Sequence, residues 1–472
     1  MNAHPFIRNI AKLLLVCLVA SVALGVAQAA LAASTIFTVN TRADAVDASP
    51  GDGECATSTG DCSLRAAIQE ANALAGHDVI ILPANPYSTT YALTIPGTNE
   101  NQSATGDLDV RDNLTILGAG PMVTVISYDT NGHDADRLLQ NHYANTTISG
   151  VRFSSGNFSP GVGGGINNRG TLTLENSEVI NGGTREKGGG IYNSGTLTLK
   201  NVKVSDNEVD SYWALAWGGG IFNTGTLNVY NSTFSGNSTY VTEPDEITSQ
   251  GGAIYNRGTA TIFRSIFSGN HAESGPYNMG DVSGGAIYNR GTLTIRESRL
   301  TNNSAHTGGG LATFGALSRV TLEDSTVSGN GNGAYHGGGV YNGGSLLVIR
   351  ASTFANNYGS WGGGLANDGW AIVINSTFSG NTAGQGGGIY NFGLIGSRKL
   401  SLHNVTITAN TASGGGGGVY SDSATSLRLQ NTAIAGNNDS DSPDCYGTLN
   451  SLGYNLVGDN TNCDLIPGVG DQ

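Results

Sequence analysis

The chain has 472 residues, of which 72 are Gly, and its formal net charge is −14. Gly at about 15 % is roughly twice the average usage, whereas charged residues are about half as frequent as in an average protein. A chain this acidic lacks the positive field that phosphate binding needs, so the composition excludes nucleic acid as a partner. It also excludes a helical bundle, and it excludes collagen because the Gly residues cluster in twos and threes. An all-β protein of short strands and tight turns remains.

The first 33 residues have the pattern of an export signal. Arg8 and Lys12 precede an apolar run over 13–27, which is followed by several Ala residues. A positive start, an apolar stretch of this length and a small-residue exit are typical of a secretory signal peptide. The run is also shorter than the roughly 20 residues that a membrane span needs. We expect an exported protein, extracellular or on the cell surface, whose mature chain has no transmembrane segment.

Four cysteines remain once Cys17 is removed with the signal, namely Cys55, Cys62, Cys445 and Cys463. An even number in an exported chain favours disulfides, and four cysteines allow three pairings. Closeness in sequence selects Cys55–Cys62 and Cys445–Cys463, one pair near each end of the fold. Zinc is the alternative, but no His lies at ligand spacing beside either pair.

A helix is expected after Ser63, which is placed as N-cap, with Gly76 available to end it. Its apolar face would carry Leu64, Ala67, Ile68 and Ala71. An amphipathic helix in front of repeated strands should cover the open end of the first coil, because that end would otherwise expose unpaired backbone groups.

The middle of the chain repeats one motif ten times, at intervals of 24 to 33 residues. Gly-Gly-(Gly/Ala) precedes an apolar residue at Ile166, Ile191, Ile221, Ile254, Ile287, Leu311, Val340, Leu365, Ile389 and Val419. Each unit reads as three short strands with Gly or Asn at the corners. Propeller blades need roughly 40–45 residues, and Gly clusters would destabilise helical repeats. The pattern therefore predicts an all-β fold, a right-handed parallel β-helix, whose handedness follows the rule for parallel crossovers.

Stacked coils would align equivalent residues in columns. One expected Asn column holds Asn181, Asn207, Asn237, Asn270, Asn303, Asn330, Asn357, Asn381, Asn410 and Asn437. A second holds Asn176, Asn201, Asn231, Asn375, Asn404 and Asn431. Asn tolerates the left-handed backbone of a corner, and its amide can bond to the same amide one coil away. The pairs Phe234–Phe267 and Phe354–Phe378 should fill the core.

Three segments resemble a known group of proteins. Cys62-Ser-Leu-Arg-Ala-Ala-Ile-Gln-Glu-Ala-Asn72 is similar to the "CSLREAI" N-terminal module of exported bacterial β-helix proteins, with Ala66 where Glu is usual. The Gly-Gly-Gly-Ile-Tyr-Asn repeats resemble those of polymorphic outer-membrane proteins, and 444–458 resembles the segment that precedes a surface anchor in many relatives. The resemblance implies a β-helix outside the cytoplasm and no single activity. We divide the chain into a signal peptide (1–33), an N-terminal cap with entry coils (34–160), β-helix repeats (161–440) and a disulfide-stapled closing segment (441–472).

The longer units carry insertions between the third strand and the next Gly cluster, which should lie side by side along one edge. They span 208–217, 238–250, 271–283, 331–336 and 358–361. Aromatic faces at a regular rise could stack sugar rings. Our candidate ligand-binding residues are Trp213, Trp217, Tyr240, Tyr277, Tyr335, Tyr358 and Trp361, with Tyr212 beside them. The alternative is that these rings bury one another.

A second candidate site lies where charged residues interrupt the second Asn column. Glu297 and Asp324 would stand on adjacent coils, about 5 Å apart along the stack. Paired carboxylates serve glycoside hydrolases, and Arg264 is the nearest base for a polysaccharide lyase. The alternative is an exposed, alternating ladder of ion pairs, continued by Arg296 and Glu323 in the neighbouring column.

We expect a secreted or cell-surface β-helix protein that binds glycans or envelope surfaces, as an adhesin does, without catalysis. One alternative is a polysaccharide lyase or glycoside hydrolase on the same scaffold, and another is a passive extracellular structural protein. We expect no cofactor, no metal site, no nucleic acid partner and a monomeric state. A polysaccharide or cell-envelope glycan is the expected partner.

Overall fold

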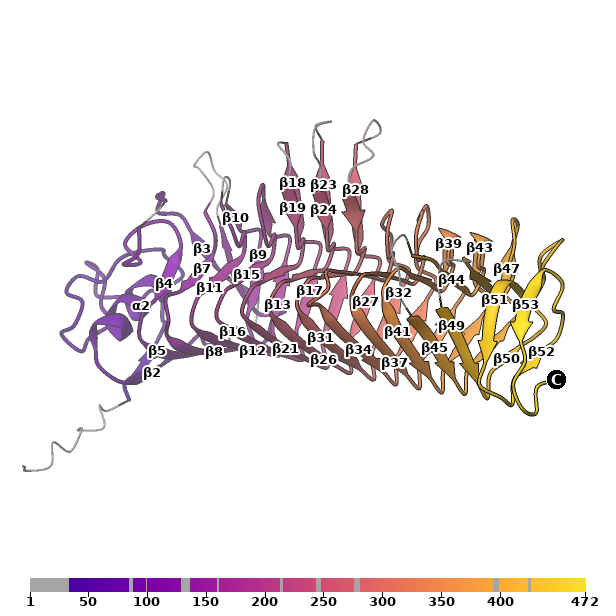
Figure 1. Cartoon of the computed structure of the whole chain (residues 1–472). Coiled ribbons are helices and arrows are strands. Elements are labelled where there is room, and N and C mark those ends of the chain that lie inside the picture. Colours follow the sequence, from indigo (N-terminus) through magenta and orange to yellow (C-terminus); the bar gives the residue numbers. More distant parts are fainter. Residues whose placement is uncertain are drawn as a thin grey trace, which may run out of the picture.

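The computed structural model describes residues 34–84, 88–98, 100–128, 136–158, 161–212, 215–242, 248–275, 281–393, 399–422 and 426–472. The expected signal peptide, 1–33, lies outside these residues. Over the described part, the chain winds into an elongated parallel β-solenoid with one short helix, α2 (Leu64–Ala73), at its N-terminal end (Figure 1). The all-β parallel solenoid expected from the repeats is confirmed.

Each coil of the repeat region contributes three strands. The coil that starts with the Gly cluster before Ile191 consists of β15 (Ile191–Asn193), β16 (Thr196–Lys200) and β17 (Lys203–Ser205). The next two coils repeat it as β20 (Ile221–Asn223), β21 (Thr226–Tyr230) and β22 (Thr233–Ser235), then β25 (Ile254–Asn256), β26 (Thr259–Phe263) and β27 (Ile266–Ser268). Equivalent strands pair in parallel and in register, so Ile191 lies beside Ile221, and Ile221 beside Ile254. Over the described residues, a 28-stranded sheet holds the first two strands of each coil and a 14-stranded sheet holds the third.

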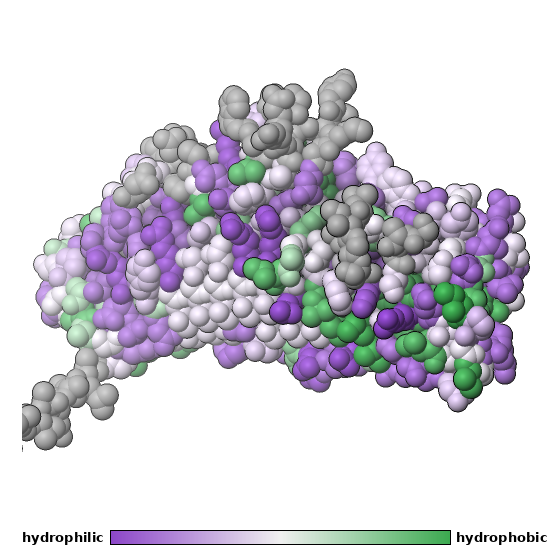
Figure 2. All heavy atoms as spheres, in the orientation of Figure 1, coloured by the Kyte–Doolittle hydropathy of each residue, from purple (hydrophilic) through white to green (hydrophobic). Residues whose placement is uncertain are grey.

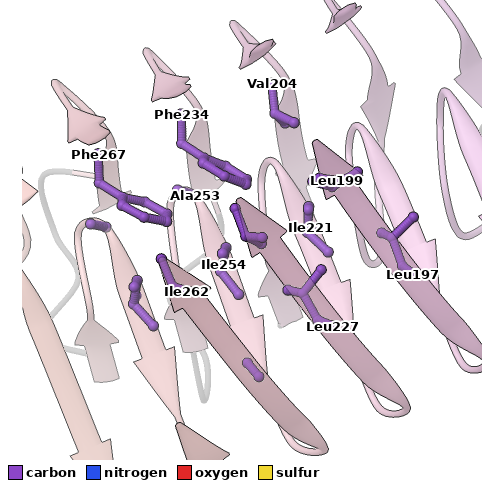
Figure 3. Close-up of a cluster of buried hydrophobic side chains, with 14 of the residues drawn as sticks. Leu197, Leu199, Val204, Ile221, Leu227, Phe234, Ala253, Ile254, Ile262 and Phe267 are labelled. Atoms are coloured by element: carbon purple, nitrogen blue, oxygen red, sulfur yellow. The ribbon is translucent and has the colours of Figure 1, made fainter. Parts of the chain in front are cut away.

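The core follows from the alternation within each strand. In β21, Leu227 and Val229 are buried, whereas the residues between and beside them face outward. Because the register repeats, inward residues of one coil stack on those of the next, as Figure 3 shows for three coils. Phe234 and Phe267 are fully buried with ring centroids 4.5 Å apart. The expected core columns are thus confirmed, and Phe354–Phe378 repeats the arrangement at 4.5 Å.

A buried Asn ladder runs along one corner from Asn207 to Asn437. Each side-chain Nδ2 donates to the Oδ1 of the next Asn at 2.8–3.0 Å, and the last one donates to Asp444. The expectation that Asn181 belongs to this ladder is wrong. Gly182 occupies the ladder position, where its backbone N–H donates to Asn207 Oδ1 at 2.8 Å, while Asn181 is exposed at a φ of 55°.

The corner after the first strand carries a second buried ladder. It holds Asn141, Asn168, Asn193, Asn223, Asn256 and Asn289, and later Asn342, Asn367 and Asn391, joined at 2.6–2.9 Å. Thr313 interrupts it, and the hydroxyls of Ser318 and Ser345 complete the hydrogen bonding there. The expected column of Asn176, Asn201 and their equivalents forms a third, exposed ladder in the left-handed conformation.

A helix covers the N-terminal end of the solenoid, and a disulfide lies near each end. At the N-terminal end, Ser63 Oγ caps α2 by accepting from the Ala66 backbone N–H, and Ala67 and Ile68 enter the core. The helix ends at Ala73, before Gly76, because Leu74 already has an extended backbone. The structure contains both expected disulfides, Cys55–Cys62 and Cys445–Cys463. Among the described residues, no helix is long and apolar enough to span a membrane.

Candidate functional site

The insertions of three neighbouring coils stack into a ridge along one side of the solenoid. We call the described parts of 208–217, 238–250 and 271–283 the loop ridge. Its rising strands are β18 (Glu208–Ser211), β23 (Ser238–Val241) and β28 (His271–Ser274), and its returning strands are β19 (Leu215–Trp217), β24 (Thr248–Gln250) and β29 (Asp281–Ser283). Each set pairs in parallel, and the hairpins project from the same corner (Figure 1). The expectation that the insertions lie side by side is confirmed for the described parts of these three.

Small buried apolar clusters pack the rising strands of the loop ridge against its returning strands. Val209, Ala216 and Val241 bury one another between its rising and returning strands. Ala272 and Val282 do the same one coil further on. Since the backbone groups of each hairpin also pair with the next hairpin, the ridge extends the solenoid and is more than a row of independent loops.

Trp217 is part of the base of this ridge. Its ring stacks on Tyr255 with a centroid distance of 5.1 Å and on Phe222 at 6.0 Å. Its Nε1 donates to Thr248 Oγ1 at 2.9 Å, and the Lys187 ammonium lies 4.9 Å from the ring centroid. Because protein groups already contact the faces of this ring, its position fits the alternative of mutual burial better than an open sugar platform.

The rings under Trp217 form an aromatic column that the sequence reasoning missed. Tyr192, Phe222, Tyr255 and Tyr288 stack at centroid distances of 5.0–5.4 Å. They are the Tyr or Phe of the Gly-Gly-(Gly/Ala)-Ile-aromatic-Asn motif, so their recurrence could have revealed the column. Burial raises the pKa of Tyr255 and Tyr288, which keeps both hydroxyls neutral. Further along the solenoid, Tyr420 stacks on Tyr446 at 4.6 Å, and Tyr390 lies tilted against Tyr420 at 5.1 Å.

Other candidate rings differ in their exposure. Trp361 stacks on His336 with a centroid distance of 4.7 Å, and burial lowers the pKa of that His. Tyr335 and Tyr358 are 53 % and 51 % exposed, and Tyr240 is half-buried. Tyr212, which directly follows β18, is also exposed, with the Arg185 guanidinium over its ring. Trp213 and Tyr277 lie outside the described residues.

The charged residues that interrupt the Asn column lie on the surface, and two of them form an ion pair. Arg264 Nε lies 2.7 Å from Glu297 Oε2, and the two side chains are 59 % and 43 % exposed. Arg264, Glu297 and Asp324 keep the left-handed φ of 47–49° that Asn has in other coils. In the neighbouring column, Arg296 pairs with Glu323 at 2.7 Å. Open solvent around both acids is unlike the water-excluded surroundings that tune a catalytic carboxyl.

Buried charges gather instead in the entry coils, where the sequence suggested no site. Asp107, Asp136 and Arg137 are each at least nine-tenths buried, and Arg137 Nε lies 3.2 Å from Asp107 Oδ2. Next to them, His142 Nε2 lies 2.7 Å from Asp109 Oδ1. Burial, and then the neighbouring carboxylates of Asp109 and Asp136, raise the pKa of Asp107 well above its usual value. Within the described residues, no group of His, Cys, Asp and Glu side chains is arranged to hold a metal ion.

A polar groove of about 300 Å³ lies beside the exposed Asn ladder. It is lined by Pro121, Asn176, Ser177, Glu178, Asn201, Val202, Lys203, Asn231 and Thr233. The amides, the carboxylate and the ammonium of this lining offer both donors and acceptors to a ligand lying along the coil-stacking direction.

Three segments of the chain match the Chlamydia polymorphic membrane protein (Chlamydia_PMP) repeat, namely 231–257, 264–290 and 375–391. Each spans a Gly cluster with the strand beside it, and together they cover well under half of the chain. No curated protein and no solved structure is similar enough to the chain to count as a match.

Proposed function

We propose that the protein acts at the outer membrane or cell surface as an adhesin-like binding protein. The repeats that it shares with the Chlamydia polymorphic membrane protein model support this location, because that model describes a membrane protein. The loop ridge supports binding, since a rigid solenoid that presents stacked loops is a common way to display contact residues.

The ligand class that fits best is a neutral or weakly charged glycan. Tyr212, Tyr335 and Tyr358 are the exposed rings of the insertions, and aromatic faces stack on sugar rings. Tyr240, together with Trp213 and Tyr277, stays among the candidates. Trp217 and Trp361 act chiefly as supports, because Trp217 stacks on Phe222 and Tyr255, and Trp361 stacks on His336. The polar groove beside Asn201 adds hydrogen-bonding groups of the kind that sugar hydroxyls use.

Retention on immobilised polysaccharides tests this proposal. Tyr335→Ala combined with Tyr358→Ala should lower retention at least fivefold without changing the melting temperature, because both rings are exposed. The matched control is Tyr143→Phe, which keeps an exposed ring on another part of the solenoid and should retain wild-type binding. Equal retention by the wild type, the double variant and the control would show that these aromatic rings do not bind the polysaccharide.

A polysaccharide lyase or glycoside hydrolase is the second candidate, and a passive structural protein is the third. The enzyme candidate depends on Glu297, Asp324 and Arg264. The exposed ion pair between Arg264 and Glu297, and the exposed position of Asp324, favour a structural role. Chain shortening during incubation with polysaccharide would favour the enzyme, and retention without shortening would favour the binding protein.

A further inference from the structure

One stretch of the long sheet departs from its own repeat on the outward face. In β12 (Thr171–Glu175), β16, β26 and β31 (Thr292–Arg296), the first two outward residues are both Thr. In β37 (Leu346–Arg350) the same positions hold Leu346 and Val348, and in β41 (Trp370–Ile374) they hold Trp370 and Ile372. The inward residues of these two coils stay apolar as elsewhere, so the change concerns the surface alone.

These substitutions create an exposed apolar patch. We call Leu346, Val348, Trp370, Ile372 and Ile374 the outer patch. Trp370 is 48 % and Ile372 is 37 % exposed, and Leu317, at the turn before β34 (Arg319–Glu323), is 91 % exposed. Figure 2 shows hydrophobic side chains gathered where Figure 1 labels β37 and β41, beside a paler stretch over β16 and β21. A contiguous apolar patch with an exposed Trp and a charged border is typical of a protein interface.

The charges at the border of the outer patch select the partner. Arg319 begins β34 and Glu323 ends it, one coil before the patch. A two-fold axis parallel to the coil-stacking direction would place each Arg319 opposite the Glu323 of a second copy. Glu323 already pairs with Arg296 of its own chain at 2.7 Å, so it would then lie between two guanidinium groups. The same axis would place Ile372 against Ile372, Trp370 against Ile374, and Leu346 against the aliphatic stem of Arg350, the exposed last residue of β37. The same patch of both copies then forms the contact, as an isologous interface requires.

The other simple arrangement is disfavoured by charge. A two-fold axis parallel to the strands would reverse the order of the coils. It would place Arg319 opposite Lys399, which begins β45 (Lys399–His403) and lies over the Trp370 ring. Like charges facing each other at an interface are costly.

We propose that the outer patch pairs with a second copy of this chain, face to face and with the two solenoids parallel. This proposal replaces the monomer expected from the sequence, and it does not depend on the proposed glycan binding. The loop ridge projects from a different side of the solenoid (Figure 1). Pairing therefore leaves the ridge exposed and doubles the number of ridges, which raises avidity for a repetitive surface.

Sedimentation equilibrium of the exported protein tests the pairing. The wild type should rise from the monomer mass to twice that mass as its concentration increases. The double variant Trp370→Thr, Ile372→Thr restores the outward residues of the repeat, so it should fold as before and its dissociation constant should rise at least tenfold. The matched control Ile266→Thr removes an exposed Ile from another sheet and should pair like the wild type.

A cysteine placed on the axis tests the arrangement. Ile372→Cys should form a covalent dimer on mild oxidation, whereas Ile266→Cys should not. A wild type that stays monomeric up to its solubility limit would overturn the proposal. So would a dimer that persists in the Trp370→Thr, Ile372→Thr variant, or a dimer that Ile372→Cys fails to cross-link. Binding of anionic or neutral lipid vesicles by a monomeric wild type would assign the outer patch to a membrane surface and would equally overturn it.

Discussion

The side-chain Nδ2 of Asn303 donates to Oδ1 of Asn330 at 2.9 Å, although 27 residues separate them in the chain. The same Oδ1 accepts the backbone N–H of Asn303 at 3.0 Å, so one carbonyl oxygen serves two donors from the coil before it. Both residues are almost fully buried. This bond repeats from coil to coil, and it ties this corner of each coil to the next from Asn207 to Asn437.

Interrupting this ladder should destabilise the solenoid. Asn303→Ala removes the acceptor of the Asn270 backbone N–H and of its Nδ2, and it removes the donor to Phe267 O. A buried group left without a partner costs about 1–3 kcal/mol, so we expect a loss in that range or above. Urea unfolding followed by circular dichroism measures it. Asn228→Thr, which restores an outward Thr of β21, is the control and should stay within about 0.5 kcal/mol.

The two disulfides should stabilise the fold unequally. Cys445–Cys463 closes a longer loop than Cys55–Cys62, with sequence separations of 18 and 7. The chain-entropy model gives about 3.2 kcal/mol for the longer loop and about 2.5 kcal/mol for the shorter one. Paired Cys→Ser variants compared by thermal unfolding would show the larger loss at the C-terminal end. Equal or reversed losses would mean that local packing, not loop length, decides the contribution.

The buried carboxyl of Asp107 should make stability fall as pH rises. Burial and the charges of Asp109 and Asp136 raise the pKa of Asp107, so the folded protein keeps a proton that the unfolded chain releases near pH 3.9. The folded state is then favoured at low pH, and this contribution is lost as pH rises from about 3.9 through the raised pKa. Asp107→Asn removes the titrating carboxyl, so the variant does not lose this stability as pH rises. It should be more stable than the wild type at pH 7, with a difference that shrinks towards pH 4.

A pH series of melting temperatures measures this difference. Asp324→Asn is the matched control, because it makes the same change at an exposed carboxyl. A destabilised Asp107→Asn variant at pH 7 would mean that its ion pair with Arg137 outweighs the burial of the charge.

Trp217 and Tyr358 should respond differently to truncation. Trp217→Ala removes stacking on Tyr255 and the hydrogen bond to Thr248, so about 1–3 kcal/mol of stability should be lost. Tyr358→Ala removes an exposed ring and should leave the melting temperature unchanged. Differential scanning calorimetry separates the two. If the Trp217→Ala variant has wild-type stability, the ring does not support the fold, and it is again a candidate for ligand contact.

Most of the fold could be predicted from the repeat, because the signals of the repeat are local and redundant. Ten Gly clusters, alternating strands and corner Asn residues each point to the same winding, so one irregular coil does not mislead the interpretation. The Asn181 error shows the limit of reading columns by type alone. In that coil an Asn-Gly pair occupies the corner, and only the register of Ile180 beside Ser205 shows that Gly182 takes the ladder position.

The candidate site was harder to predict because ring exposure depends on contacts between coils. Sequence placed Trp217 and Tyr358 on the same edge, yet Trp217 packs under the ridge and Tyr358 faces solvent. The buried group around Asp107 and Arg137 arises from segments about 30 residues apart that become adjacent coils. The alternation of apolar and polar residues along a strand does not reveal such clusters, because it predicts that the polar residues face solvent.

Incubation of the purified protein with a panel of neutral and uronate polysaccharides tests the central claim most directly, with both retention and chain length measured. We expect the protein to retain at least one polysaccharide without changing its length. The opposite result would be a polysaccharide that the wild type shortens and that a Glu297→Gln, Asp324→Asn double variant leaves intact. That result would contradict a binding protein without catalysis, and it would make the exposed acids a catalytic site.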